Sequence, residues 1–543
     1  METQNCNVVT NLFTASQTHP DRNAIILQQQ GRSRFVTFKQ LWDKVDSFST
    51  ALIERSIRPG DRIILMIPMS IELYIAMLGV IKAGGVAVFI DPWIGFKQIA
   101  SFCSFANPKG FIGIPKSHLL RLFRKELVRL PLTVSTGRCF FGFPAGWSFA
   151  SFLRRPGNGA IFKAAPDDPA LITFTSGSSG VPKGANRTHG FLWAQYKALK
   201  TEFPYEPNDV DMPMFPVFSL NNIAGIRTSV IPDMNFKKLA EIRPDIIYKQ
   251  MAKNGVTTAT ASPLFFDKLS DYLSTQNLKL PKLRRILTGG APVQDDQLVK
   301  WQQSFDTTEV IIVYGSTEAE PVSHISLEKR IALSQEKPKI NKGYCTGKPA
   351  SSVKAKVIKI KKGPVIFRQR WENHEVAAQG DIGELIVSGD HVCRDYYNNP
   401  DAVQSNKIID ADGVTWHRMG DTGYFDSSGL FWLAGRLHST IVRGKKNYHA
   451  QLIEQAITET FPDFEKVAAL GMADPQWGEA IIIVINPGKT HAEPDLIKKE
   501  MESKGYPIDR IIFTTAELPV DPRHNAKTDY GKLKHLILTK KIS

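Results

Sequence analysis

The segment Thr173-Phe-Thr-Ser-Gly-Ser-Ser-Gly-Val-Pro-Lys-Gly184 begins at the end of an apolar run, Ala170 to Phe174, and precedes a helix expected to start near Thr188. The apolar run is typical of a buried strand, where a flexible surface linker rarely begins. Hydroxyls, glycines and an ammonium group on a loop after a strand can wrap a polyphosphate. These groups belong to Thr175, Ser176, Gly177, Ser178, Ser179, Gly180 and Lys183. We therefore predict a phosphate-binding loop, although its spacing differs from G-x-x-x-x-G-K-[ST].

Around this loop, from about Phe35 to Ile231, short apolar runs rich in β-branched residues alternate with helix-length amphipathic stretches. This alternation predicts an α/β fold with strand-helix-strand units around a parallel sheet. Strands dominate from Gly347 on, and a mixed pattern restarts after Arg436. We expect a large N-terminal domain of parallel and mixed sheets with a β-rich subdomain over residues 1–436. A small, mobile α+β domain is expected over residues 437–543.

The expected elements are short and closely spaced. Strands are predicted at 62–67, 86–90, 170–174, 256–260, 283–288, 310–314, 354–359, 383–387, 429–433, 439–442, 466–472 and 480–485. Helices are predicted at 69–82, 263–273, 450–459 and 495–503.

The composition is that of a globular protein. The chain has 543 residues, of which 42% are hydrophobic and 22% charged, so disordered, collagen-like and coiled-coil classes are excluded. The five cysteines are Cys6, Cys103, Cys139, Cys345 and Cys393. Their odd number and the lack of a C-x-x-C pair indicate neither a disulfide framework nor a thiolate zinc site. A reducing, cytoplasmic compartment is expected.

The formal net charge of +15 suggests polyanionic partners, namely nucleic acid, anionic membrane or phosphorylated small molecules. Basic residues form only short clusters without a long aromatic-interleaved tract, so nucleic acid is not expected as a partner. The most apolar stretch, Ile63 to Ile90, is interrupted by Pro68, Glu72 and Lys82. We therefore predict no transmembrane segment.

Three further motifs follow in order: Tyr314-Gly-Ser-Thr-Glu318, Gly420-Asp-Thr-Gly-Tyr424 and Gly435-Arg436. With the phosphate loop, they resemble the signatures of the adenylate-forming superfamily in order and approximate spacing over nearly the whole chain. That superfamily includes AMP-forming acyl-CoA synthetases, luciferases and peptide-synthetase adenylation domains. The resemblance implies an AMP-forming ligase that uses ATP and Mg²⁺ to activate a carboxylic acid as its small-molecule substrate.

The motif residues also suit a nucleotide site chemically. Tyr314 would stack on adenine, and Asp421 would accept hydrogen bonds from both ribose hydroxyls. Glu318 would bind Mg²⁺, and Arg436 would lie near the phosphates. The resemblance assigns further nucleotide contacts to Gly315, Ser316, Thr317, Gly289, Gly290 and Ala291. For the last three, within Thr288-Gly-Gly-Ala-Pro292, a plain Gly-Pro turn is the alternative.

The resemblance assigns the catalytic groups to Thr175, Glu318 and a lysine near the C-terminus. Asp521-Pro-Arg-His-Asn-Ala-Lys527 aligns with the superfamily motif Pro-x-x-x-x-Gly-Lys, although Asn-Ala replaces its Ser-Gly pair. Lys532 is a second candidate, but the spacing to the following leucine favours Lys527 as the bridge between substrate carboxylate and α-phosphate. His438 takes the hinge position, where Asp or Lys is usual.

Three departures from the acyl-CoA synthetases bear on the second half-reaction. Phe215-Pro-Val-Phe-Ser219 has serine in place of the histidine that lines the acyl pocket, so we expect substrate contacts from Phe218, Ser219 and Gly290. Gly444-Lys445-Lys446 replaces the usual Gly-Gly passage for pantetheine. The segments 211–218, 231–234 and 522–527 look most like those of bacterial olefin-pathway β-lactone synthetases. Those enzymes activate a 2-alkyl-3-hydroxy fatty acid and close it on its own hydroxyl.

Three functions remain open at this point. The first is an ATP-dependent β-lactone synthetase, in which the second attack is intramolecular and gains from proximity. The second is a fatty-acyl-CoA or acyl-carrier ligase, and the third a non-catalytic binding protein of the same fold. The first two would place the chain beside other enzymes of a hydrocarbon or fatty-acid pathway.

Overall fold

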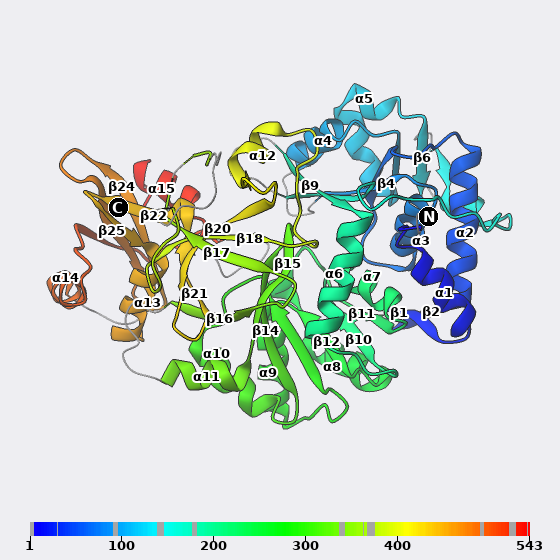
Figure 1. The fold of residues 1–543 in the computed structure, drawn as a ribbon. Coiled ribbons are helices and arrows are strands. Elements are labelled where there is room, and N and C mark those ends of the chain that lie inside the picture. Colours follow the sequence, from blue (N-terminus) through cyan, green and yellow to red (C-terminus); the bar gives the residue numbers. More distant parts are fainter. Residues whose placement is uncertain are drawn as a thin grey trace.

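The computed structural model describes residues 5–29, 31–90, 96–137, 146–175, 182–335, 343–361, 363–365, 375–488, 493–520, 528–539 and 541–542. Within these residues the strands form three sheets. The N-terminal elements lie at one end of the molecule and the C-terminal sheet at the other (Figure 1). No helix in the described ranges is long and apolar enough to cross a membrane.

The first sheet carries the start of the predicted phosphate loop. Among the described residues it has seven strands in the order β7-β6-β5-β3-β4-β8-β9, and all pairs are parallel except β8 with β9. Its strands are β3 (Arg62–Met66), β4 (Val86–Ile90), β5 (Gly110–Gly113), β6 (Leu132–Ser135), β7 (Trp147–Ser148), β8 (Pro169–Thr175) and β9 (Lys183–Thr188).

The second sheet has fourteen strands among the described residues, and its central part, β1-β11-β10-β12-β13-β14, is parallel. The remaining pairs are antiparallel and form the β-rich region. Its strands are β1 (Asn23–Gln29), β2 (Arg32–Thr37), β10 (Val210–Pro213), β11 (Thr228–Ile231), β12 (Thr258–Ala261), β13 (Arg285–Gly289), β14 (Glu309–Ser316), β15 (Ala319–Ser326), β16 (Tyr344–Pro349), β17 (Lys354–Ile358), β18 (Gly383–Ser388), β19 (Lys407–Ile409), β20 (Thr415–Phe425) and β21 (Phe431–Arg436).

The third sheet lies entirely within the C-terminal part of the chain. Its strands are β22 (Thr440–Arg443), β23 (Lys446–His449), β24 (Lys466–Asp474), β25 (Gly478–Asn486) and β26 (Arg510–Phe513). Within the described part of this sheet, β26 pairs in parallel with β25, and the other pairs are antiparallel. The sheet starts four residues after Arg436, and the division into domains at 436 and 437 stays a prediction.

Helices cover the sheets. They are α1 (Thr10–Thr18), α2 (Phe38–Glu54), α3 (Ile71–Lys82), α4 (Phe96–Phe105), α5 (Lys125–Val128), α6 (His189–Glu202), α7 (Pro216–Ala224), α8 (Pro244–Asn254), α9 (Pro263–Gln276), α10 (Asp295–Ser304), α11 (Leu327–Gln335), α12 (Pro400–Asn406), α13 (Ala450–Thr460), α14 (Pro494–Ser503) and α15 (Tyr530–Leu538). Shorter 3₁₀ turns are η1 (Pro115–Phe123), η2 (Phe149–Leu153), η3 (Leu239–Glu241) and η4 (Leu437–Ser439).

The predicted α/β class is confirmed, and the differences are local. Helix α3 begins at Ile71 rather than at Met69, because Ser70 caps it by accepting a hydrogen bond from the Leu73 N–H at 3.3 Å. It is buried almost all round, which agrees with its apolar sequence. Strand β9 was not predicted. It follows the phosphate loop and precedes α6, which begins one residue after Thr188 as expected.

Candidate active site

The site is built at the carboxyl ends of neighbouring parallel strands. In β13 and β14 Gly289 lies opposite Val313, so the next residues, Gly290 and Tyr314, leave the same edge of the sheet side by side. Ligands of parallel sheets bind at this edge. The predicted adenine wall and the predicted adenine stacker are thus brought together.

Gly289 is required by the close approach of these strands. A Cβ atom on Gly289 would lie 2.2 Å from the Val313 carbonyl oxygen, which is far inside van der Waals contact. Gly290 follows with φ of +83°, a left-handed conformation that side chains other than glycine rarely adopt. A plain turn residue would not need both features, so the geometry favours a backbone surface over a simple Gly-Pro turn.

Asp421 is the centre of a three-residue contact. It lies opposite Arg436 in the antiparallel pair of β20 with β21, and Arg436 Nη1 is 3.0 Å from Asp421 Oδ1. The Tyr314 hydroxyl donates to Asp421 Oδ2 at 2.5 Å. Burial and the neighbouring carboxylate raise the pKa of Tyr314 well above its ordinary value, so the phenol stays protonated and donates. Three residues from separate motifs therefore meet at one carboxylate.

Glu318 has its own set of neighbours. Its Oε1 accepts a hydrogen bond from the Tyr396 hydroxyl at 3.0 Å. Lys407, buried at the start of β19, donates through Nζ to His417 Nδ1 at 3.1 Å and to the Cys393 carbonyl oxygen. Burial opposes ionisation of Glu318, but His417, Lys407 and the Tyr396 hydroxyl outweigh it and hold the pKa of Glu318 below its ordinary value.

An ionised Glu318 fits a magnesium ligand. Mg²⁺ in phosphate-transfer sites is held by one or two carboxylates and takes its other ligands from phosphates and water. The described residues contain no group of three His, Cys, Asp or Glu side chains that could hold a metal ion. Phosphates of the nucleotide and water would supply the other ligands of a metal ion at Glu318.

The residues between Tyr314 and Glu318 form a tightly packed turn with one buried, unsatisfied hydroxyl. The hydroxyl oxygen of Ser316 is buried and has no hydrogen-bond partner among the described residues. Arg187 of β9 donates through Nη2 to the Thr317 carbonyl oxygen at 2.7 Å and fixes this turn against the first sheet. A Cβ atom on Gly315 would lie 2.7 Å from the Ala319 carbonyl oxygen. An orphaned buried hydroxyl is the kind of group that a bound phosphate or nucleobase satisfies.

The phosphate loop itself lies largely outside the described residues, since residues 176–181 and the Thr175 side chain are not placed. Its two ends are defined: Thr175 pairs with Lys183 across the β8–β9 hairpin. Asn399, the cap of α12, donates through Nδ2 to the Pro182 carbonyl oxygen at 2.8 Å. Lys183 is thereby held at the base of the loop, next to Thr175 in the sheet.

Two of the three predicted substrate contacts, Phe218 and Ser219, lie on α7, which follows β10, whereas Gly290 directly follows β13. Ser219 is fully buried, and Phe218 packs in part against Leu199 and Ile311. Tyr74 of α3 donates through its hydroxyl to the Pro216 carbonyl oxygen at 3.2 Å, and burial raises its pKa. The position that carries histidine in acyl-CoA synthetases is thus a buried serine without a basic group.

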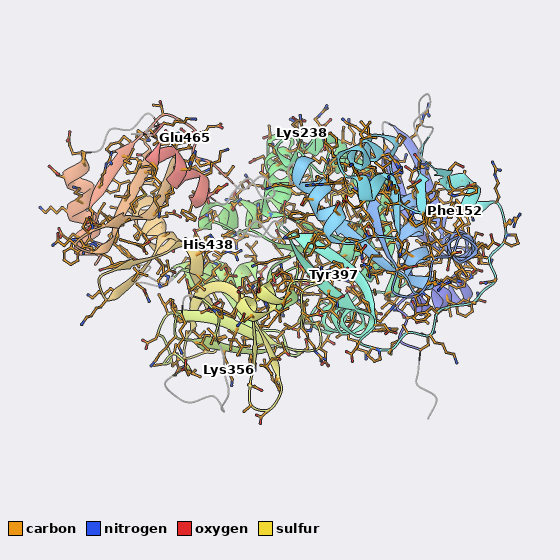
Figure 2. The ribbon with its side chains drawn as sticks, turned by 90° about the horizontal axis from the view of Figure 1, so that it is seen from above. Phe152, Lys238, Lys356, Tyr397, His438 and Glu465 are labelled. Carbon is orange, nitrogen blue, oxygen red and sulfur yellow. The ribbon has the colours of Figure 1, made fainter. Side chains whose placement is uncertain are left out.

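The predicted hinge residue, His438, lies in η4, directly before the third sheet. Figure 2 shows His438 at the junction between the C-terminal part and the rest of the chain. Burial and Arg436 lower the pKa of His438. Lys527 lies outside the described residues. The segment that carries it is closed at its base by the antiparallel bridge of Val520 with Thr528, whereas Lys532 is exposed in the first turn of α15.

Sequence reasoning missed the neighbours of Glu318. Tyr396, Lys407 and His417 lie in three segments whose residue types and spacing carry no recognisable signal. Only their burial around one carboxylate identifies them. Arg187 was missed for the same reason, because its contact with Thr317 joins two different sheets.

Comparison with known proteins agrees with this architecture. Residues 12–397 match the family model described as AMP-binding enzyme. The chain is 30% identical to an olefin beta-lactone synthetase of Xanthomonas campestris pv. campestris and 28% identical to one of Stenotrophomonas maltophilia, with 97% of each chain covered in both cases. The ATP-bound structure of MatB from Rhodopseudomonas palustris superimposes with a TM-score of 0.78 at 21% identity, over 98% of this chain and 99% of that one.

The fold and the site, with the match over most of the chain, place this protein in the family of AMP-binding enzymes. It is an AMP-forming, ATP-dependent ligase that belongs with the adenylate-forming enzymes.

Proposed function

We propose that this ligase activates a 2-alkyl-3-hydroxy fatty acid and closes it to a β-lactone with release of AMP and pyrophosphate. The observation that carries the proposal is the full-length similarity, at 30% identity, to a protein named olefin beta-lactone synthetase. Ser219 supports it, because the buried serine offers no imidazole at the acyl pocket. Lys445, in the turn between β22 and β23, and Lys446, the first residue of β23, are both exposed and replace the glycines expected for a pantetheine passage.

The first half-reaction makes the carboxylate an electrophile. A carboxylate oxygen attacks the α-phosphorus of ATP, the bond to pyrophosphate breaks, and an acyl-adenylate forms. This transfer needs positioning and charge neutralisation more than covalent help. Asp421 and Tyr314 would hold the nucleoside, while Lys183 and Lys527 would supply positive charge at the phosphates. Mg²⁺ bound at Glu318 would neutralise phosphate charge.

The second half-reaction needs no further co-substrate. The oxygen of the 3-hydroxyl attacks the carbonyl carbon, AMP leaves with the electron pair of the broken C–O bond, and the hydroxyl proton passes to solvent. Because the nucleophile belongs to the substrate, its effective concentration is high without a second binding site. We propose that the C-terminal part, residues 437–543, turns about His438 between the two steps.

The test is product analysis with the purified enzyme, ATP and MgCl₂, with and without CoA. A synthetic 2-alkyl-3-hydroxy acid should give AMP, pyrophosphate and a neutral product that has lost one water, with CoA making no difference. The matched acid without the 3-hydroxyl should still support pyrophosphate exchange and give no neutral product. A thioester that forms only with CoA would assign an acyl-CoA ligase instead, and absence of pyrophosphate exchange with both acids would leave a non-catalytic binding protein.

A further inference from the structure

The segment 115–129, which contains η1 and α5, exposes a cluster of large apolar side chains. Its exposed apolar residues are Leu119 (44% exposed), Leu122 (58%), Phe123 (55%) and Val128 (44%). These are four of the thirteen most exposed large hydrophobic residues in the described part of the chain, gathered within ten positions. Soluble surfaces carry single exposed apolar residues, whereas a cluster of them marks an interaction surface. Figure 1 shows α5 at the outer edge of the molecule.

The same segment is strongly basic. Lys116, Arg124, Lys125 and Arg129 are exposed, and Glu126 is the only acidic residue between them. No ion pair or side-chain hydrogen bond joins any of these four cations to another described residue. The surface therefore combines apolar side chains with a surrounding set of free positive charges.

Hydrogen bonds of two buried polar side chains, Arg121 and His118, support this surface from below. Arg121 donates through Nε to the Leu127 carbonyl oxygen at 3.0 Å and through Nη2 to the Val128 carbonyl oxygen at 3.1 Å. Its Nη1 lies 3.3 Å from Nδ1 of His118, which is fully buried. A guanidinium only donates, so Nδ1 accepts and His118 Nε2–H donates to the Val134 carbonyl oxygen at 3.2 Å.

These hydrogen bonds of Arg121 and His118 explain why the apolar side chains are exposed to solvent. Burial lowers the pKa of His118 to about 4, so the imidazole is neutral at pH 7, as the hydrogen bonds require. Leu120 and Leu127 point inward and are buried, which leaves Leu119, Leu122 and Val128 to the outer face. The exposure is thus built into the fold of η1 and α5.

We propose that the segment 115–129 is a docking surface for the face of an anionic lipid bilayer. Apolar side chains flanked by lysine and arginine suit the boundary between acyl chains and negatively charged headgroups. A protein partner would remove water from these cations, and it would need a carboxylate placed against each of them to compensate. A lipid surface supplies mobile anions that can reach all of them. The protein would lie on the bilayer, since no described helix could span it.

Vesicle sedimentation of the purified full-length protein tests this surface. Vesicles of phosphatidylcholine with phosphatidylglycerol in equal parts should bind the protein, vesicles of phosphatidylcholine alone should bind it far less, and added salt should release it. The double variant Leu122→Ser/Phe123→Ser should bind at least about tenfold more weakly. For the triple variant Arg124→Gln/Lys125→Gln/Arg129→Gln, the affinity for anionic vesicles should fall roughly fivefold for each charge removed.

Matched controls remove the same number of exposed apolar or cationic side chains elsewhere. Phe35→Ser/Leu496→Ser removes two other exposed apolar side chains, and Lys237→Gln/Lys253→Gln/Lys499→Gln removes three other exposed charges. Both should bind vesicles like the unaltered protein, and all four variants should keep pyrophosphate exchange with a water-soluble acid.

Equal vesicle binding by the segment variants and their controls, or no binding to anionic vesicles at all, would overturn the proposal. So would a fall in the sedimentation mass of the segment variants without vesicles, because that result assigns the surface to a second copy of the chain. The outcome is independent of which product the enzyme makes.

Discussion

The hydroxyl of Tyr530, the first residue of α15, donates a hydrogen bond to Oε1 of Glu454 on α13 at 2.9 Å. The Ala469 N–H donates to the same oxygen, also at 2.9 Å. Tyr530 lies three residues beyond Lys527, so this half-buried carboxyl fixes one end of the segment that carries the predicted catalytic lysine. Lys466 of β24 and Tyr344 of β16 also act electrostatically on this cluster.

The first prediction follows from the burial of Glu454. Burial raises the pKa of Glu454 to about 7 from an ordinary value of 4.5. The folded state therefore holds the proton more tightly than the unfolded state, so this contribution to stability is complete below about pH 4.5 and is lost as pH rises to about 7. Glu454→Gln keeps Oε1 as acceptor and has no charge to bury. Relative to the variant, the free energy of unfolding of the wild type should fall by roughly 3 kcal/mol between these pH values.

Urea unfolding of both proteins between about pH 4.5 and 8 measures this difference. The control is Glu502→Gln, a change at an exposed carboxylate on α14. Its free energy of unfolding should depend on pH in the same way as that of the wild type. Identical pH dependence in wild type and Glu454→Gln would contradict the prediction.

The second prediction concerns the magnesium ligand. Glu318→Gln keeps the shape of the side chain and an oxygen for the Tyr396 hydroxyl, but it removes the negative charge that would hold Mg²⁺. Pyrophosphate exchange should fall on the order of 10²-fold or more. Excess MgCl₂ should restore part of the rate if binding of the metal ion is the defect. Glu328→Gln, at an exposed position on α11, is the control, and normal exchange by Glu318→Gln would remove Glu318 from the metal site.

The third prediction separates the two lysines. Lys527→Ala should lose on the order of 10²-fold or more in adenylate formation while it still binds ATP, because the nucleoside contacts lie elsewhere. Lys532→Ala should be close to wild type, since Lys532 is exposed and its backbone N–H already bonds to Asp529 at 3.0 Å. The reverse pattern in pyrophosphate exchange would transfer the catalytic role to Lys532.

The fourth prediction divides the two functions of Tyr314. Tyr314→Phe keeps the ring and loses the hydrogen bond to Asp421, so KM for ATP should rise about fivefold with little change in kcat. Tyr314→Ala also loses the ring and should raise KM by a further tenfold or more. Steady-state kinetics with varied ATP measures both values. Equal defects in the two variants would mean that the hydroxyl, rather than stacking, supplies the binding energy.

Much of the fold follows from local sequence. Runs such as Val86–Ile90 become strands because β-branched residues with no polar interruption are stable only in a covered sheet. Helix ends follow from caps such as Thr188, whose hydroxyl accepts from the Phe191 N–H at 3.1 Å. The strand at β12 begins two residues later than predicted, because Gly255 ends α8 in a left-handed conformation and Val256 still belongs to the turn.

The motifs of the candidate site were likewise visible in the sequence, because a nucleotide demands particular chemical groups at loops after strands. Tyr314, Asp421 and Arg436 were each identified in the sequence. Their mutual contact was not, since it depends on the register of β20 against β21 and on the arrival of β14 beside them. Register is set by the whole sheet and cannot be read from three short segments.

The sequence by itself therefore determined the α/β class, the adenylate-forming motifs and the serine at 219, all of which depend on residue type and spacing along the chain. The tertiary structure alone decided which groups surround Glu318 and which side chains of the segment 115–129 face outward. Lys407 and His417 reach Glu318 through sheet pairing across about ninety residues of chain. Arg121 and Leu122 are neighbours in sequence, yet one is buried and the other exposed, because the hydrogen bonds of Arg121 to α5 fix the orientation of the turn.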